Sequence, residues 1–312
     1  MSSGLNTHHR CFWLAMNFIP RGRTSMIRPK SGSTFAIRWL SAIIVLAFAH
    51  KPLCATSGDG GVSASASRSI EAAGQRLVAA YPDFLTAAAN NVLVWKDATR
   101  MAIDDGVGAK PHAAWLAAPD LEDMFEMPYP AGAPALAPAL NQDPGRARNA
   151  AFFQKMYGDC RAGDVTKSLV EIVWLPRKSG QRLQVTSING VARKLEAISR
   201  ILDQLPSRFD RYLAPAAGAY NCRTIAETER TSAHGYGIAI DIAIKHAGYW
   251  RWSKPLAGGI YAYRNEIPRE IIEVFEAHGF IWGGRWYHYD TMHFEYRPEF
   301  FAERADGASS RK

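Results

Sequence analysis

The segment from Thr231 to Ile244 places one histidine and one aspartate seven residues apart among small and apolar residues. In an extended strand, Ala239, Asp241 and Ala243 would share one face, while the isoleucines at alternate positions would share the other. A carboxylate buried on such a strand without a partner would be strongly destabilising. We therefore expect a positively charged group to meet Asp241 in the space that its two small neighbours leave.

His234 is a candidate to lie opposite this carboxylate. On one continuous strand an odd separation would place it on the other face from Asp241. Gly235 and Gly237 interrupt the strand and allow the chain to turn. We therefore expect His234 to face Asp241 across a small gap, where the two side chains could bind a divalent metal ion.

A third ligand is predicted in the segment from Tyr289 to Tyr296, where His293 and Glu295 would share one face of a strand. Two imidazoles and one carboxylate suit zinc. Three protein ligands leave the fourth tetrahedral position to water, which is the pattern of catalytic zinc sites. The sequence thus predicts Zn²⁺ as the cofactor, held by His234, Asp241 and His293.

Hydrolysis at such a site also needs a carboxylate, because a proton must pass from the attacking water to the leaving group. Asp290, three residues before His293, and Glu295, on the same strand face as His293, are both close enough, and spacing alone does not separate them. His288, two residues before Asp290, could donate a hydrogen bond to an oxyanion. A purely structural role is the alternative for His288.

Together the two segments resemble the VanY-like zinc D-alanyl-D-alanine carboxypeptidase family. The resemblance rests on Ser232-x-His234-x-x-Gly237-x-Ala239-x-Asp241, followed about fifty residues later by Asp290-x-x-His293. It covers roughly residues 183–302. The family includes phage L-alanyl-D-glutamate endopeptidases and shares its fold with the Hedgehog signalling domain.

The resemblance implies the role of each residue in the two motifs. The two histidines and Asp241 would bind zinc, and Asp290 would be the general base. Ser232 and Glu295 would then lie behind the ligands. The family uses an arginine upstream of the first ligand to hold substrate; Arg223 matches that place, and Arg230 is the alternative.

The activity implied is hydrolysis of peptidoglycan stem peptides. We expect a monomeric D-Ala-D-Ala carboxypeptidase, and an L-Ala-D-Glu type endopeptidase is an alternative that the sequence does not separate. A non-catalytic, zinc-containing cell-wall binding module is a third hypothesis. The presence of Asp290 and the open fourth ligand position argue against it.

The elements that must position these residues are predicted from apolar spacing. Strands are expected at 168–175, 182–187, 238–244 and 292–296, and helices at 191–205 and 268–278. Upstream we expect a flexible linker at 56–66, a helix at 67–80, paired strands within 91–103 and a surface loop at 128–147. Helices and strands mix without a βαβ rhythm, which favours an α+β fold. The resemblance implies a small antiparallel sheet with flanking helices.

The positive charge of the chain is concentrated at its N-terminus. Residues 1–55 contain seven arginines and lysines and no acidic residue, so the formal net charge of +8 leaves the rest nearly neutral. A near-neutral body gives no reason to expect a nucleic-acid partner. The apolar and charged fractions, 47% and 21%, are ordinary for a globular protein.

The same N-terminal stretch is typical of a signal peptide. A basic region ends at Arg38, and the 11-residue apolar run 39–49 is too short to cross a bilayer comfortably. Cleavage is possible after Ala49 or after Ala55, and Met26 is an alternative start. We expect a periplasmic or extracellular protein with no membrane span after cleavage; a short N-terminal membrane anchor is the alternative.

Export also decides how the cysteines are interpreted. Cys11 leaves with the signal, and Cys54 leaves too if cleavage follows Ala55, so that Cys160 and Cys222 remain. In an oxidising compartment this pair predicts a disulfide, with two free buried thiols as the alternative.

The predicted domain organisation therefore has four parts. They are a signal peptide at 1–55, a region of unknown role at 56–160, a zinc peptidase domain at 161–305 and a tail at 306–312.

Overall fold

The computed structural model describes residues 59–302. The predicted signal peptide, its cleavage sites and the predicted tail lie outside the described residues, and those predictions remain untested. Over residues 59–302, no helix has the length and the apolar composition that crossing a membrane would require.

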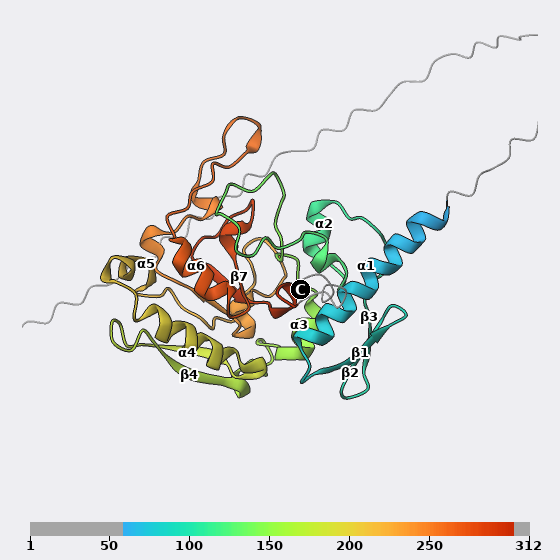
Figure 1. Cartoon of the computed structure of the whole chain (residues 1–312), viewed down its shortest axis with the longest axis horizontal. Coiled ribbons are helices and arrows are strands. Elements are labelled where there is room, and N and C mark those ends of the chain that lie inside the picture. Colours follow the sequence, from blue (N-terminus) through green and yellow to red (C-terminus); the bar gives the residue numbers. More distant parts are fainter. Residues whose placement is uncertain (1–58, 303–312) are drawn as a thin grey trace, which may run out of the picture. The chain divides into compact units, whose positions relative to one another are not determined.

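The first part of the chain builds a helix on a small sheet (Figure 1). The elements are α1 (Asp59–Ala80), β1 (Leu85–Ala89), β2 (Val92–Trp95), β3 (Arg100–Ala102), α2 (His112–Ala117) and α3 (Ala150–Tyr157). The strands pair antiparallel in the order β1-β2-β3. Helix α1 lies so close to β1 that a Cβ atom on Gly74 would come within 2.6 Å of the Ala88 side chain.

Two expectations for this region need correction. Helix α1 begins at Asp59, so the predicted linker is wrong over residues 59–66. The alanines and serines there have no strong preference against a helix, and lengthening an existing helix costs far less than starting one. Strand β1 was not predicted, because its run of small residues lacks the β-branched and aromatic side chains typical of strands.

The second part contains a hairpin, three further helices and the sheet that carries the candidate site. In order they are β4 (Leu169–Trp174), β5 (Gln181–Thr186), α4 (Val191–Leu202), α5 (Asp210–Leu213), β6 (Ala239–Asp241), α6 (Arg269–Glu276), β7 (Phe280–Trp282) and β8 (His293–Tyr296). The last sheet is antiparallel in the order β6-β8-β7. The fold is thus α+β with small antiparallel sheets and flanking helices, as predicted.

The helices around this sheet bury one apolar face each. Leu195, Ile198 and Leu202 of α4 are fully or almost fully buried. The ring of Phe275 on α6 stacks on Phe294 of β8, with centroids 3.8 Å apart. This packing fixes β8, which carries His293, against the rest of the core.

Strand β6 is shorter than the predicted strand at 238–244. It ends at Asp241, which pairs with His293 of β8. Ile244 begins a 3₁₀ turn and is 49% exposed, so the predicted alternation does not continue. The ladder stops after the Ile242 N–H donates to the Met292 carbonyl (3.0 Å), because residues 291–292 form a turn. The site aspartate therefore lies at the end of a strand rather than in its middle.

The first and second parts share one hydrophobic core, whose residues run from Ala73 to Tyr296. A chain of buried hydrogen bonds also joins them. Tyr81, which directly follows α1, donates to Glu299 (2.7 Å), and Arg297 donates to both Glu299 (2.5 Å) and Glu295 (3.1 Å). Arg297 also donates to the carbonyl of Gly145 (2.6 Å). Residues before 160 therefore support the end of β8 directly.

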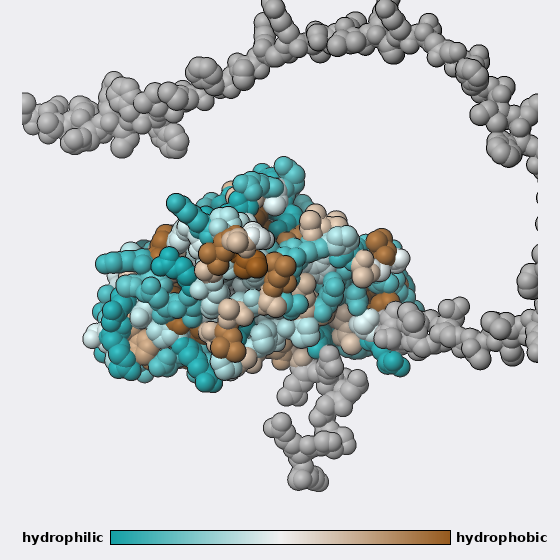
Figure 2. Space-filling model, turned by 90° about the horizontal axis from the view of Figure 1, so that it is seen from above, coloured by the Kyte–Doolittle hydropathy of each residue, from teal (hydrophilic) through white to brown (hydrophobic). Residues whose placement is uncertain are grey.

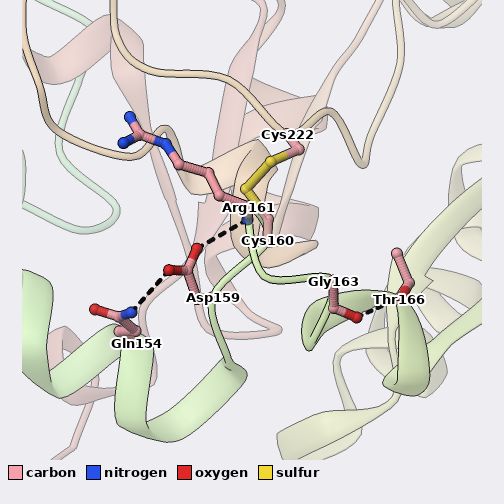
Figure 3. The surroundings of a disulfide bond; sticks show 7 residues. All are labelled: Gln154, Asp159, Cys160, Arg161, Gly163, Thr166 and Cys222. Atoms are coloured by element: carbon pink, nitrogen blue, oxygen red, sulfur yellow. Dashed lines mark hydrogen bonds between the residues drawn. A yellow bond between two sulfur atoms is a disulfide. The ribbon is translucent and has the colours of Figure 1, made fainter.

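The predicted disulfide between Cys160 and Cys222 is confirmed (Figure 3). It links the chain just after α3 to the segment that precedes His234. Asp159 fixes the backbone around Cys160, because its carboxylate accepts hydrogen bonds from Gln154 (3.1 Å) and from the backbone N–H of Arg161 (2.8 Å). The bond thus ties the two parts of the chain together beside Arg223.

The surface shows no dominant apolar area on the face seen in Figure 2. Hydrophilic side chains predominate there, and apolar residues gather in a few small groups. Single exposed apolar residues are normal in a folded protein.

Candidate metal centre and active site

His234 lies in a 3₁₀ turn, Ala233–Tyr236, that ends at Gly237. Gly237 has a φ of +69°, a left-handed conformation that glycine adopts without strain. The Nδ1 atom of the buried His234 donates to the carbonyl of Ala219 at 2.5 Å. That bond fixes the tautomer, so Nε2 carries the lone pair and points toward Asp241.

The structure brings together the three residues that the sequence predicted as zinc ligands. Asp241 Oδ2 lies 3.2 Å from His234 Nε2, and Asp241 Oδ1 lies 3.0 Å from His293 Nδ1. The two imidazole nitrogens are 3.2 Å apart. Pairing of β6 with β8 places Asp241 opposite His293, and the glycine turn places His234 beside both.

Glu295 lies behind His293, as expected. Its Oε2 is 3.0 Å from His293 Nε2, which leaves Nδ1 of the imidazole for the cluster. Glu295 is fully buried and accepts hydrogen bonds from Arg148 (2.8 and 3.1 Å) and from Arg297 (3.1 Å). Burial would raise the pKa of the Glu295 carboxyl, but Arg148, His293 and Arg297 hold it well below its usual range.

These three side chains fit a zinc ion by the chemistry of their donors. Each histidine uses one nitrogen for an outer partner and presents the other to the cluster, which is how metal-binding imidazoles are usually oriented. Burial would lower the pKa of His293, yet hydrogen bonds and charge from Asp241 and Glu295 raise it to about 10. The cluster therefore stabilises positive charge at the point where the donors converge.

Asp290 is the acidic side chain that faces the pocket beside this cluster. A cavity of about 100 Å³ is lined by Asp290, His293 and His288, among others. The Oδ1 atom of Asp290 is buried and has no hydrogen-bond partner among the described residues. Burial and the charge of Asp241 raise the pKa of the Asp290 carboxyl to about 7. A carboxyl with such a pKa can both accept and return a proton near neutral pH.

The geometry thus distinguishes the two carboxylates that spacing left equivalent. Asp290 lines the pocket and has an unpaired oxygen, whereas Glu295 does not line it and is occupied by His293 and two arginines.

Arg223 and Ser232 also line this pocket. Arg223 is exposed, next to the disulfide, and Ser232 is buried, with its backbone N–H donating to the Arg223 carbonyl at 3.0 Å. Arg230, the alternative substrate-binding arginine, lines a neighbouring cavity instead. Of the two candidates, Arg223 is therefore the one that shares a cavity with His293 and Asp290.

His288 lies in the pocket through a contact that the sequence did not predict. Its backbone N–H and its Nδ1 atom bind the two oxygens of Asp143, at 3.0 and 2.7 Å. Asp143 also accepts from His112 (2.8 Å) and Arg146 (3.3 Å). Burial would raise the pKa of the Asp143 carboxyl, but the hydrogen bonds from His112 and His288 and the charge of Arg146 hold it well below its usual range.

This second cluster leaves Nε2 of His288 as the nitrogen available to the pocket. Asp143, Arg146 and Arg148 all come from the region before residue 160, for which the sequence suggested no role. Asp143 and Arg146 belong to the Pro-, Ala- and Gly-rich segment 128–147, whose lack of periodicity gave no signal of a site.

Comparison with known proteins relates the core of this site to one family. Residues 226–296 match the family model described as D-alanyl-D-alanine carboxypeptidase. The matched range holds His234, Asp241, Asp290 and His293, but not Arg223. No curated protein and no solved structure matches the chain. The match supports a peptidase related to peptidoglycan.

Proposed function

We propose that this chain is an exported zinc metallopeptidase that hydrolyses peptidoglycan stem peptides, with D-Ala-D-Ala carboxypeptidase activity favoured. The observation that carries the proposal is the shared pocket: His293, one member of the His234–Asp241–His293 cluster, lines a cavity that Asp290 and Arg223 also line. Ligands, base and a cation for the substrate are the groups that such a reaction needs.

Zinc, when bound by the three side chains, supplies a Lewis acid that polarises a carbonyl and lowers the pKa of water. Asp290 takes the proton from the water that adds to the scissile carbonyl. It then gives that proton to the nitrogen as the C–N bond breaks, so the products are a carboxylic acid and an amine. Nδ1–H of His288 is bound to the Asp143 carboxylate, so in its imidazolium form His288 can donate from Nε2 to the oxygen that becomes negative.

The charge of the pocket supports a chain end as the substrate. Arg146, Arg148 and Arg223 line it, and a guanidinium binds a carboxylate with two parallel hydrogen bonds. A carboxypeptidase needs such a group for the terminal carboxylate, and we assign that role to Arg223. An internal cut would need room on both sides of the scissile bond, which a cavity of about 100 Å³ offers less readily.

Export is supported by the disulfide. Disulfides persist in oxidising compartments and are rare in the cytosol, so Cys160–Cys222 agrees with the signal peptide predicted at 1–55. We propose a periplasmic or extracellular monomer whose partner is the peptide of peptidoglycan and not nucleic acid.

The test is digestion of a defined pentapeptide stem and of purified peptidoglycan by the protein, with zinc and with a chelator, followed by mass spectrometry. Zinc-dependent loss of one terminal D-Ala is the expected result. Cleavage of an internal bond would show that the protein is an endopeptidase and not a carboxypeptidase. No product from folded, zinc-loaded protein would overturn the enzymatic proposal and favour a binding module.

A further inference from the structure

A second cavity, of about 290 Å³, adjoins the active-site pocket. The two share Arg148 as a wall, and consecutive residues divide them: Thr231 lines the second cavity, and Ser232 lines the first. The rest of its lining includes Arg230 and the start of α3. No aspartate or glutamate lines this cavity. Of the two arginines in the lining, Arg148 is paired with the buried Glu295 at 2.8 Å, which leaves Arg230 as the cation to be accounted for.

Arg230 is the least balanced cation in this wall. Its Nη1 atom is buried and has no hydrogen-bond partner among residues 59–302. Burial, together with the charges of Arg148 and Arg146, lowers the pKa of Arg230 to about 10. A partly buried guanidinium without an acceptor is costly, because desolvation is not offset by an ion pair. An anion in the cavity would supply the missing acceptor.

The start of α3 adds further donors. Asn149 caps this helix, because its side chain accepts from the N–H of Phe152 at 2.9 Å. The amides of Ala150 and Ala151 have no intrahelical acceptor, as is general for a first turn, and both residues line the cavity. The partial positive charge of a helix N-terminus favours an anion there.

We propose that this cavity is a substrate subsite that binds a carboxylate located away from the scissile bond. The inference rests on the proposed peptidase function, since the shared Arg148 wall lets one peptide occupy both cavities. An acidic peptide and a free inorganic anion offer the same chemistry, and the tests below separate them. The subsite would give residues 148–151, outside the family-matched range, a role in recognition.

The first test measures anion binding without turnover. Inorganic phosphate is titrated into metal-free protein, with chloride at equal ionic strength as the reference. Arg230→Gln should weaken phosphate binding roughly 10- to 100-fold, the usual effect of losing a charged hydrogen bond. Arg230→Lys should retain part of the affinity, because it keeps the charge but not the planar donor pair. Arg200→Gln, an exposed change on α4, is the matched control and should have no effect.

Thermal unfolding of the same variants shows whether each of them is folded. Arg230→Gln should be as stable as the wild type without anion, or more stable, because it removes an unpaired, partly buried charge. Phosphate binding that is unchanged in stable Arg230→Gln protein would overturn the proposal.

The second test identifies the occupant. Two pentapeptide stems, one with the glutamate α-carboxylate free and one with it as a carboxamide, are titrated calorimetrically into Asp290→Ala protein, with and without Arg230→Gln. The carboxylate form should bind roughly 10- to 100-fold more tightly, and Arg230→Gln should remove that preference. Equal binding of both peptides, even if phosphate binds, would overturn a substrate subsite in favour of a free-anion site. Because binding is read without hydrolysis, failure of the wild type to cut either peptide would count only against the proposed function.

Discussion

Two clusters of one aspartate and two histidines lie in the described part of the chain, and their carboxylates are bound differently. In the first, each oxygen of Asp241 faces one imidazole, and the outer nitrogens of His234 and His293 are held by a carbonyl and a carboxylate. The side chain of Asp241 remains 19% exposed. In the first cluster, the Asp241 oxygens and the inner nitrogens of the two histidines thus converge on one point that solvent can reach.

The second cluster consists of His112, Asp143 and His288, and its donors already satisfy the carboxylate. Oδ2 of Asp143 accepts hydrogen bonds from both imidazoles and from Arg146, and Oδ1 accepts one from the backbone N–H of His288. Asp143 is fully buried. Here an arginine of the chain supplies the charge that an ion would supply in the first cluster. Residue types alone therefore do not define a metal site; the source of the charge that balances the carboxylate does.

The largest effects are expected from replacing the aspartate of each cluster in turn. Asp241→Asn should abolish zinc binding and turnover, because it removes a ligand and its charge. Asp143→Asn should retain one equivalent of zinc. Metal content after dialysis, with folding checked by circular dichroism, measures both. A second equivalent of zinc in the wild type that Asp143→Asn loses would make the second cluster a metal site.

Asp290 separates binding from chemistry within the first site. Asp290→Ala should lower turnover by roughly 10²- to 10⁴-fold, the usual contribution of a general base, while zinc content stays unchanged. Asp83→Ala, at an exposed position, is the matched control. Turnover of Asp290→Ala at the wild-type rate would show that another residue is the general base.

The second cluster should act on catalysis through His288. Asp143→Asn should lower kcat by roughly 10- to 100-fold with little change in KM, because a misoriented His288 would fail to stabilise the transition state. His112→Gln removes the other imidazole from the same carboxylate and should have a smaller effect. An equal loss in both variants would indicate general loosening of the loop instead of positioning of His288.

The smallest expected effect is on acid stability. The pKa of Asp143 is lower in the folded protein than the unfolded value of about 3.9, so its contribution to stability is present above that pH and is lost as pH falls through the folded pKa. Below about pH 4, the wild type should therefore lose more stability than Asp143→Asn does. Thermal unfolding of both proteins across pH, in chelator, measures this, and parallel curves would contradict it.

The sequence predicted the first cluster and not the second for a physical reason. His234, Asp241 and His293 lie on a glycine turn and two short strands, and local spacing determines which way such side chains point. Asp143 reaches His288 only through tertiary packing of a loop without periodicity. The same limit explains the end of β6, because pairing with β8 rather than local alternation decides where that strand stops. Disulfide pairing was predictable only because two cysteines remain once the predicted signal peptide at 1–55 is set aside.

The buried line from Tyr81 through Glu299, Arg297 and Glu295 to His293 bears on how the catalytic segment could be used in isolation. A fragment beginning at residue 161 would lack Tyr81, Arg148 and the Gly145 carbonyl. Glu295 and Arg297 would then be left in the core with fewer partners. The segment that matches the family is therefore not an independent module in this protein: its predicted metal ligand His293 is held in place through Tyr81, which follows a helix more than two hundred residues earlier.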